Sequence, residues 1–234
     1  MPQAVAQQLK ARTGLDYIEG YGLSETMAAT HLNPPHRPKA QCLGLPLFGV
    51  DARVIDPRTL REVPPGASGE IVVHAPQLMR DYWRQPQADA AAFMCIEGKR
   101  FLRTGDFGRV DEESYFFMTD RLKRMINCGG LKVWPAEVEA LLYRHPAVQE
   151  VCVVATPDAR RSEAVKALVV RRTSSADVDK RALMHWTRQH LAAYKCPRVV
   201  KFVASLPRLD SGKLLWRVLQ DREFLRAESG RETA

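Results

Sequence analysis

The chain of 234 residues lacks any long hydrophobic run. Its longest apolar stretches, such as Val151–Ala155, have the length of a strand. A membrane-spanning helix needs about 20 apolar residues, and the first residues also lack the apolar core of a signal peptide. We therefore expect a cytoplasmic protein with no integral membrane segment, for which peripheral membrane contact stays open.

Cysteine and histidine patterns that bind metal are also missing. The five cysteines are widely spaced, no C-x-x-C pair occurs, and no group of cysteines and histidines has the spacing of a zinc site. Reduced thiols in a cytosolic protein are the expectation for such a pattern.

The two halves of the sequence differ in charge. Residues 1–120 hold 13 Lys and Arg against 15 Asp and Glu, whereas residues 121–234 hold 22 against 12. A basic half indicates a polyanionic partner, either nucleic acid or a phosphate-rich small molecule. The basic residues are scattered and no aromatic–basic nucleic-acid motif occurs, which favours the small molecule.

Local patterns predict a mixture of α/β and α+β structure. We expect a helix over Pro2–Arg12, a strand over Leu15–Glu19, and a loop over Leu32–Pro46. Short alternating strands bounded by turn residues predict a small β subdomain over residues 46–120. From 121 to 234 strands and helices alternate, which predicts a compact α+β domain. The boundary falls near Asp120–Lys123, where charge and pattern both change.

The first stretch with functional residues is Tyr21-Gly22-Leu23-Ser24-Glu25-Thr26. A flat aromatic ring can stack on a base, a hydroxyl can bond a phosphate oxygen, and a carboxylate can hold Mg²⁺. Taken alone, the string also fits a Tyr21 packed in a core and a Glu25 at the start of a helix.

Three further stretches hold candidate functional residues, and each has a purely structural interpretation. Asp106 in Arg103-Thr104-Gly105-Asp106 could be a turn residue, and Gly129-Gly130 a hairpin turn. Lys213 in Leu206-Pro207-Arg208-Leu209-Asp210-Ser211-Gly212-Lys213 could be a solvated loop lysine. Gly129-Gly130 belongs to the longest of these stretches. It runs from Asp120-Arg121-Leu122-Lys123-Arg124 through Gly129-Gly130 to Val133-Trp134-Pro135-Ala136-Glu137-Val138-Glu139.

In this order, the four stretches resemble the motifs of the AMP-forming acyl-CoA synthetases, members of the adenylate-forming superfamily. Ser24 stands where the family's Y-G-x-T-E has Thr, and the wording around Trp134 looks most like the fatty-acyl–CoA branch. The resemblance covers essentially the whole chain. It implies that residues 1–120 are the end of the large AMP-binding N-terminal domain, and that 121–234 are the mobile C-terminal domain.

The resemblance also implies roles for single residues. Tyr21, Gly22, Ser24, Asp106 and Arg121 would bind the nucleotide, with Asp106 on the ribose hydroxyls. Other roles would be metal binding and catalysis for Glu25, adenylation for Lys213, the hinge for Lys123, and the CoA path for Gly129 and Gly130.

The implied reaction uses ATP, Mg²⁺ and coenzyme A. A carboxylate attacks ATP to give acyl-AMP, and the CoA thiol then displaces AMP, while the C-terminal domain rotates between the two steps. The expected substrate is a medium- or long-chain fatty acid. Small-molecule substrates are thus the expected partners, and nucleic acid is not.

The sequence departs from the family in lacking its upstream Gly/Ser/Thr-rich phosphate loop. We therefore expect a C-terminal fragment with little or no synthetase activity alone, and exposed apolar residues around Leu15–Tyr21. Three alternatives remain: an aryl-CoA ligase, an adenylation domain serving a carrier protein, and a non-catalytic nucleotide-binding remnant.

Overall fold

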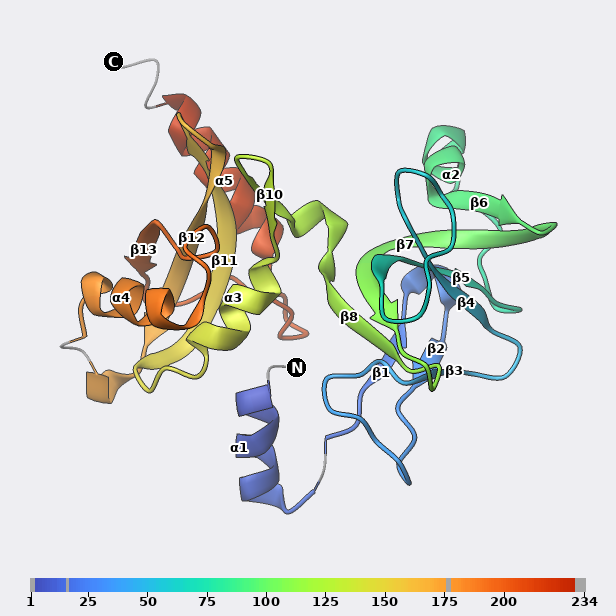
Figure 1. Ribbon diagram of the computed structural model, residues 1–234, viewed down its shortest axis with the longest axis horizontal. Helices are drawn as coiled ribbons and strands as arrows, with labels where there is room; N and C mark the ends of the chain where they lie inside the picture. The colour runs from blue at the N-terminus through green and yellow to red at the C-terminus, as the bar shows by residue number, and fades with distance from the viewer. Residues whose placement is uncertain (1–2, 16, 176–177, 230–234) are drawn as a thin grey trace. The chain divides into compact units, whose positions relative to one another are not determined.

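The computed structural model describes residues 3–15, 17–175 and 178–229 (Figure 1). The chain divides into two compact units, the first formed by residues 6–123 and the second by residues 3–5 together with the described residues from Arg124 onward. Both combine strands with helices, which confirms the expected mixture of α/β and α+β structure. Within the described ranges, no helix is long and apolar enough to cross a membrane.

The first unit contains two antiparallel sheets (Figure 1). The smaller sheet has the order β1-β2-β3, and the larger has the order β4-β5-β7-β6 with β8 paired to β7. The bounds are α1 Gln3–Thr13, β1 Gly20–Gly22, β2 Ala29–Leu32, β3 Leu45–Pro46, β4 Asp51–Ile55, β5 Ser68–His74, α2 Pro86–Ala92, β6 Phe93–Ile96, β7 Lys99–Val110 and β8 Phe116–Arg121.

The expected strand over Leu15–Glu19 is wrong for residues 15 and 17–19, and residue 16 lies outside the described residues. The strand is β1, Gly20–Gly22, because a strand needs a partner for its backbone groups and these residues pair with β2, Tyr21 opposite His31. The loop expected over Leu32–Pro46 is wrong at its two ends, where the ladder places Leu32 in β2 opposite Leu45 of β3. The prolines and the low periodicity of residues 32–46 gave no local signal for this short pairing.

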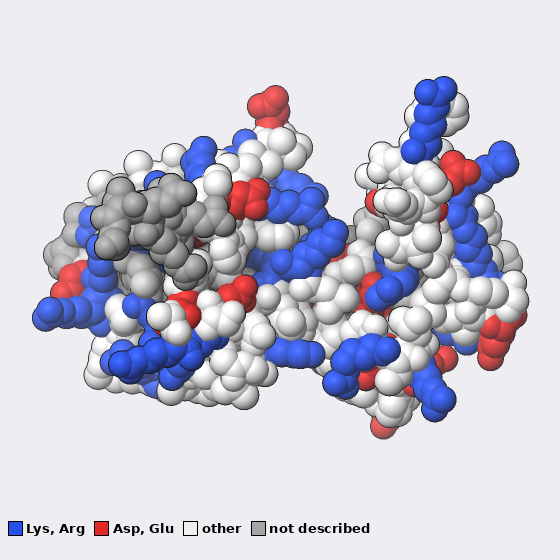
Figure 2. Space-filling view, turned by 90° about the horizontal axis from the view of Figure 1, so that it is seen from above, with Lys and Arg blue, Asp and Glu red and all other residues white. Residues whose placement is uncertain are grey.

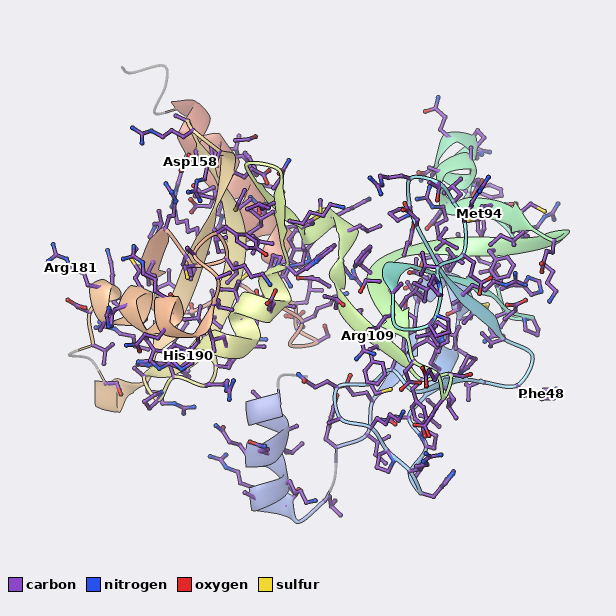
Figure 3. The ribbon with its side chains drawn as sticks, in the orientation of Figure 1. Phe48, Met94, Arg109, Asp158, Arg181 and His190 are labelled. Carbon is purple, nitrogen blue, oxygen red and sulfur yellow. The ribbon has the colours of Figure 1, made fainter. Side chains whose placement is uncertain are left out.

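Exposure of apolar residues before β1 was expected, and the outcome is mixed. The exposed fraction is 71% for Leu15 and 42% for Tyr17, which confirms the expectation for both. For Tyr21 it is wrong, because that side chain packs among the buried residues of the first unit. Farther along, the Phe48 ring is fully exposed at the edge of a loop (Figure 3).

The second unit is a five-stranded sheet with helices on both faces. The strand order is β10-β9-β12-β11, and β13 runs parallel to β12. The bounds are β9 Ile126–Cys128, β10 Leu131–Val133, α3 Pro135–Leu142, β11 Val148–Asp158, β12 Ser162–Arg171, α4 Lys180–His190, β13 Val199–Phe202 and α5 Trp216–Ser229.

Alternation along β11 explains why this sheet is covered on both faces. Val151 and Val153 belong to one apolar cluster with α3 and α4, whereas Cys152 and Val154 belong to another with α5. Successive side chains of a strand point to opposite faces, so a continuous apolar run requires a layer of helix on each side.

Charged side chains are spread over the surface of the molecule. Figure 2 shows separate patches of Lys and Arg on the visible face, with fewer Asp and Glu and with uncharged areas between them. Several of the basic residues in the second unit form ion pairs, among them Lys166 with Glu223 and Lys195 with Glu137. Part of the basic excess is therefore neutralised within the unit.

Candidate functional site

Tyr21, Asp106 and Arg121 meet at one point in the first unit, and we call them the Asp106 centre. The Tyr21 hydroxyl donates a hydrogen bond of 2.7 Å to Asp106 Oδ2. Arg121 Nε lies 3.0 Å from Asp106 Oδ1, and the two residues are register partners across β7 and β8. Three residues far apart in the sequence are thus brought together from the two sheets.

Burial governs the electrostatics of the Asp106 centre. The Asp106 side chain has no exposed surface, and desolvation raises its pKa, opposed by the Tyr21 hydrogen bond and by the charge of Arg121. Burial and the neighbouring Asp106 hold the pKa of Tyr21 far above its usual value. Tyr21 therefore stays protonated and remains a hydrogen-bond donor to the carboxylate.

Tyr21 keeps little surface free for a ligand. The residue is 9% exposed, and its ring lies edge-on to His31, with 5.6 Å between ring centroids. Stacking on a base thus stays a prediction, and it depends on a ring that the first unit largely covers.

Gly22, Ser24 and Glu25 follow directly on the chain. A Cβ on Gly22 would lie 2.6 Å from the Ala28 carbonyl oxygen, so only glycine fits where β1 ends. Ser24 is exposed and Glu25 half-buried in the 3₁₀ helix Ser24–Thr26.

The 3₁₀ helix depends on two residues that the sequence did not single out. The buried Thr26 hydroxyl accepts the Leu23 N–H and has the carbonyl oxygens of Leu23 and Ala28 within reach of its single proton, which closes the turn. The Tyr82 hydroxyl donates to Glu25 Oε1 at 2.8 Å. Thr26 is part of the first motif string and could have been recognised there. Tyr82 lies 57 positions away from Glu25, so no local pattern could indicate it.

A magnesium ion could be held only in part by this chain. Among the described residues, no three His, Cys, Asp or Glu side chains gather as a metal cluster. Glu25 Oε1 is engaged by Tyr82, whereas Oε2 accepts no hydrogen bond from a described residue. One such carboxylate fits Mg²⁺, which proteins usually bind through one or two carboxylates together with substrate phosphates and water.

Lys123, Gly129 and Gly130 lie in turns. Lys123 is exposed in the 3₁₀ turn Leu122–Arg124, where the first unit ends. Gly129 and Gly130 join β9 to β10, both with positive φ, of 65° and 87°. The Asn127 side chain accepts the Gly130 N–H, and a Cβ on Gly130 would meet open space. The turn is therefore open at Gly130, whereas Gly129 donates to the Arg161 carbonyl and a Cβ there would lie 3.8 Å from Arg161.

Lys213 lies in the second unit, in the loop before α5. Its side chain is exposed and makes no ion pair with a described residue. The loop itself is held by Arg208, which donates to the Gly212 carbonyl, and by the Leu209 N–H, which donates to the Lys213 carbonyl. A held loop thus carries a free ammonium group.

Two family descriptions match the chain. Residues 1–83 match the AMP-binding enzyme family, and residues 137–213 match the AMP-binding enzyme C-terminal domain. Asp106 and Arg121 lie between the two matched ranges.

Known proteins resemble the chain over most of its length. It is 39% identical to a long-chain-fatty-acid–CoA ligase of Bacillus subtilis over 95% of this chain and 39% of that protein. It is 40% identical to a feruloyl-CoA synthase of Amycolatopsis sp over 86% of this chain and 40% of that protein.

Solved structures agree with this likeness. The crystal structure of ATP-bound MatB from Rhodopseudomonas palustris matches with a TM-score of 0.85 and 35% identity, over 93% of this chain and 42% of that one. The chain thus spans about two fifths of the length of the curated relatives it matches. By motif order, fold and these likenesses, the chain belongs to the AMP-binding, or adenylate-forming, enzyme family.

Proposed function

We propose that this chain supplies the adenosine site and the mobile domain of an ATP-dependent acyl-CoA ligase. Such an enzyme joins a carboxylate to AMP with release of pyrophosphate, and then transfers the acyl group to the thiol of coenzyme A. The observation that carries the proposal is the Asp106 centre. It joins an aromatic donor, a buried carboxylate and a cation, which suit the base, the ribose and the phosphate of one nucleotide.

Nucleotide binding at Asp106 requires Arg121 to move. Tyr21 donates to Oδ2 and Arg121 forms an ion pair with Oδ1, which accepts no hydrogen bond among the described residues. The carboxylate has no exposed surface, whereas the Arg121 side chain is 40% exposed. The ribose hydroxyls would replace the guanidinium at Oδ1, while Tyr21 keeps Oδ2. Arg121, released at the surface, would then pair with the phosphate. The ion pair of the ligand-free protein is in this way exchanged for two contacts with the nucleotide.

Two groups would act on the phosphates. The free oxygen of Glu25 would hold Mg²⁺, which neutralises phosphate charge when it is bound. Lys213 would contact the substrate carboxylate and the α-phosphate, where an ammonium stabilises the charge that builds during attack. Lys123 would be the hinge of a rotating domain, and the open turn Gly129-Gly130 would line the path of CoA.

The proposed substrate is a medium- or long-chain fatty acid. The wording around Trp134 supports it, as does the likeness to the Bacillus subtilis ligase. The similar identity to a feruloyl-CoA synthase keeps an aryl acid as the second candidate. An adenylation domain that serves a carrier protein is a third reading, and for the isolated chain a non-catalytic nucleotide-binding remnant is a fourth.

Calorimetric titration of AMP into the 234-residue chain tests the proposal. We expect binding that Asp106→Asn weakens about tenfold, the worth of one good hydrogen bond to a charged group. The matched control is Asp210→Asn on the exposed loop before Lys213, which should bind as the wild type does. Equal weakening in both variants, or no preference for AMP over inorganic phosphate, would refute the adenosine site.

An activity assay separates the enzyme from the remnant. We expect the chain alone to form little or no acyl-CoA from ATP, fatty acid and CoA, because the phosphate loop is not in its sequence. Turnover at the rate of a full-length relative would overturn that expectation.

A further inference from the structure

Glu70 is a buried carboxylate to which the motifs assign no role. It lies in β5 with 2% of its surface exposed. Its Oε2 accepts two hydrogen bonds from Arg103, from Nε at 3.1 Å and Nη2 at 2.7 Å, and its Oε1 accepts the backbone N–H of Gly105 at 3.2 Å. All of these donors belong to the segment that ends at Asp106.

This segment bulges out of the sheet. Across β5 and β7, Glu70 pairs with Phe107 and Val72 pairs with Arg103, so residues 104–106 of β7 stand opposite Ile71 alone. Gly105 sits inside the bulge with φ of +69°, a conformation that favours glycine. A bulge breaks the ladder and leaves backbone groups without their strand partners.

Two side chains replace the lost ladder bonds. Glu70 accepts the Gly105 N–H, as described above. The Thr104 hydroxyl donates to the Ile71 carbonyl at 2.7 Å and accepts the Asp106 N–H at 3.0 Å. The bulge is thus tied to β5 at Thr104 and at Gly105, and Asp106, whose N–H bonds Thr104, follows directly after these ties.

We propose that Glu70 is a positioning residue for ribose recognition: it holds the Thr104–Asp106 bulge so that the Asp106 carboxylate faces Tyr21 and Arg121. The inference rests on the proposed adenosine site and adds a residue that does not touch the nucleotide. Glu70 acts through Gly105, since bulges redirect the side chains that follow them. Arg103 holds the other carboxylate oxygen and so fixes which way Oε1 points.

The chemistry of the contacts requires a carboxylate at position 70. Every group facing Glu70 Oε1 and Oε2 in the described structure is a donor, Gly105 on one side and Arg103 on the other. A glutamine has one acceptor oxygen and one NH₂ group, so either orientation places a donor against a donor. Glu70→Gln therefore keeps the size of the side chain and removes one of the two ties.

The test compares Glu70→Gln with Glu112→Gln, an exposed glutamate in the turn between β7 and β8. The ligand-free measurement is amide hydrogen exchange at Gly105 and Asp106 by NMR. Glu70→Gln should accelerate exchange there by about tenfold or more, while amides of β4 keep their rates, because only the local opening becomes easier. Glu112→Gln should change neither.

The nucleotide measurement compares AMP with 2′,3′-dideoxy-AMP, which lacks the ribose hydroxyls. The wild type should prefer AMP by about tenfold, and Glu70→Gln should lose most of that preference while binding of the dideoxy compound changes little. A residue that only supports the fold would weaken both nucleotides alike.

Each outcome decides the inference. Unchanged exchange at Gly105, or a preference for AMP that survives in Glu70→Gln, overturns it. If Glu70→Gln does not fold, Glu70→Asp takes its place, since it keeps the charge but shortens the reach to Gly105. Failure of both variants to fold overturns the inference too, because Glu70 would then serve the fold. A wild type that binds neither nucleotide refutes the adenosine site of the isolated chain, and amide exchange still decides whether Glu70 holds the bulge.

Discussion

The interiors of the two units differ in what they bury. Among the described residues, the second unit buries two polar side chains, Thr187 and Glu223, and the first unit buries seven. These seven are Thr26, Thr30, His31, Asn33, Glu70, Asp106 and Asp120. In the second unit an apolar cluster runs through β9, β11 and β12 into α3 and α4.

The apolar interior of the second unit favours stability, whereas the polar interior of the first unit favours ligand recognition. Burying a polar group costs free energy unless its hydrogen bonds are replaced, so the first unit gains less from its interior than the second. In return it holds a carboxylate, a phenol and a guanidinium in fixed positions. The predictions below test that contrast, from the largest expected effect to the smallest.

Truncating the apolar core should destabilise the second unit most. Leu142 of α3 is fully buried in its main cluster, so Leu142→Ala should lower the free energy of unfolding by about 2–5 kcal/mol. Urea denaturation followed by exchange of the β11 and β12 amides measures it. Leu131→Ala, at a position that is 50% exposed, is the control. Equal losses in the two variants would show that the buried apolar cluster is not what stabilises the second unit.

Acid should weaken the first unit through His31. Burial lowers the pKa of this histidine from 6.5 to about 4, and its Nε2 has no hydrogen-bond partner among the described residues. Between these two pKa values the unfolded chain binds the proton and the folded chain does not. Stability is therefore lost as pH falls, by about 2 kcal/mol from pH 7 to pH 5.

Comparison with His31→Phe isolates this effect. Asp106, whose pKa burial raises, titrates with the opposite sign, so the difference between wild type and variant is the quantity to measure. Unfolding of the first unit at pH 7 and pH 5 should show a smaller loss in His31→Phe. An identical pH dependence in both proteins would show that His31 does not carry the effect.

Removing Arg121 should change the affinity for adenosine and the affinity for AMP by different amounts. Arg121→Ala frees Asp106 Oδ1, so adenosine should bind about tenfold more tightly, an effect near 1.4 kcal/mol. AMP should gain less, because its phosphate loses the released guanidinium. Titrations with both ligands measure the ratio, and an adenosine affinity that falls as much as that of AMP would exclude the exchange of partners at Asp106. Arg109→Ala, on the same sheet, is the control.

Lys213→Ala should leave stability nearly unchanged. The side chain is exposed and without an ion pair among the described residues, so the expected change is under about 0.5 kcal/mol. Thermal unfolding of wild type and variant measures it. A loss above about 1 kcal/mol would mean that the lysine supports the fold, and its free ammonium would no longer favour a role in chemistry.

Much of the second unit was predictable because its signals are local. Two local signals are enough here: the spacing of apolar residues, and the Gly and Pro residues that bound each element. They predict the strand Leu131–Val133, the helix that begins at Pro135 and the apolar strands after Ala147. In the first unit, β6, α2 and β3 were not expected. Their sequences carry weak periodicity. The two strands depend on partners distant from any local signal, since β6 pairs with β7 and β3 pairs with β2.

The candidate site was predictable in its residues and not in its geometry. Motif strings identified Tyr21, Asp106 and Arg121, and the structure joins them through the Asp106 carboxylate. That Arg121 already occupies this carboxylate could not be read from sequence, since it depends on the register of β7 with β8. The sequence did not identify Glu70 for a similar reason, because only the bulge brings its side chain to Gly105.

One glycine connects the two sheets that supply the site. Gly44 bridges to Phe116 of β8, and it packs so closely on β2 that a Cβ would lie 2.0 Å from the Leu32 carbonyl carbon. Its φ of +102° also disfavours other residues. Any side chain there would wedge the small sheet, with Tyr21, away from β8 and Arg121. In a mutational scan for lost ligand affinity, position 44 would thus score as sensitive although it contacts no part of the ligand.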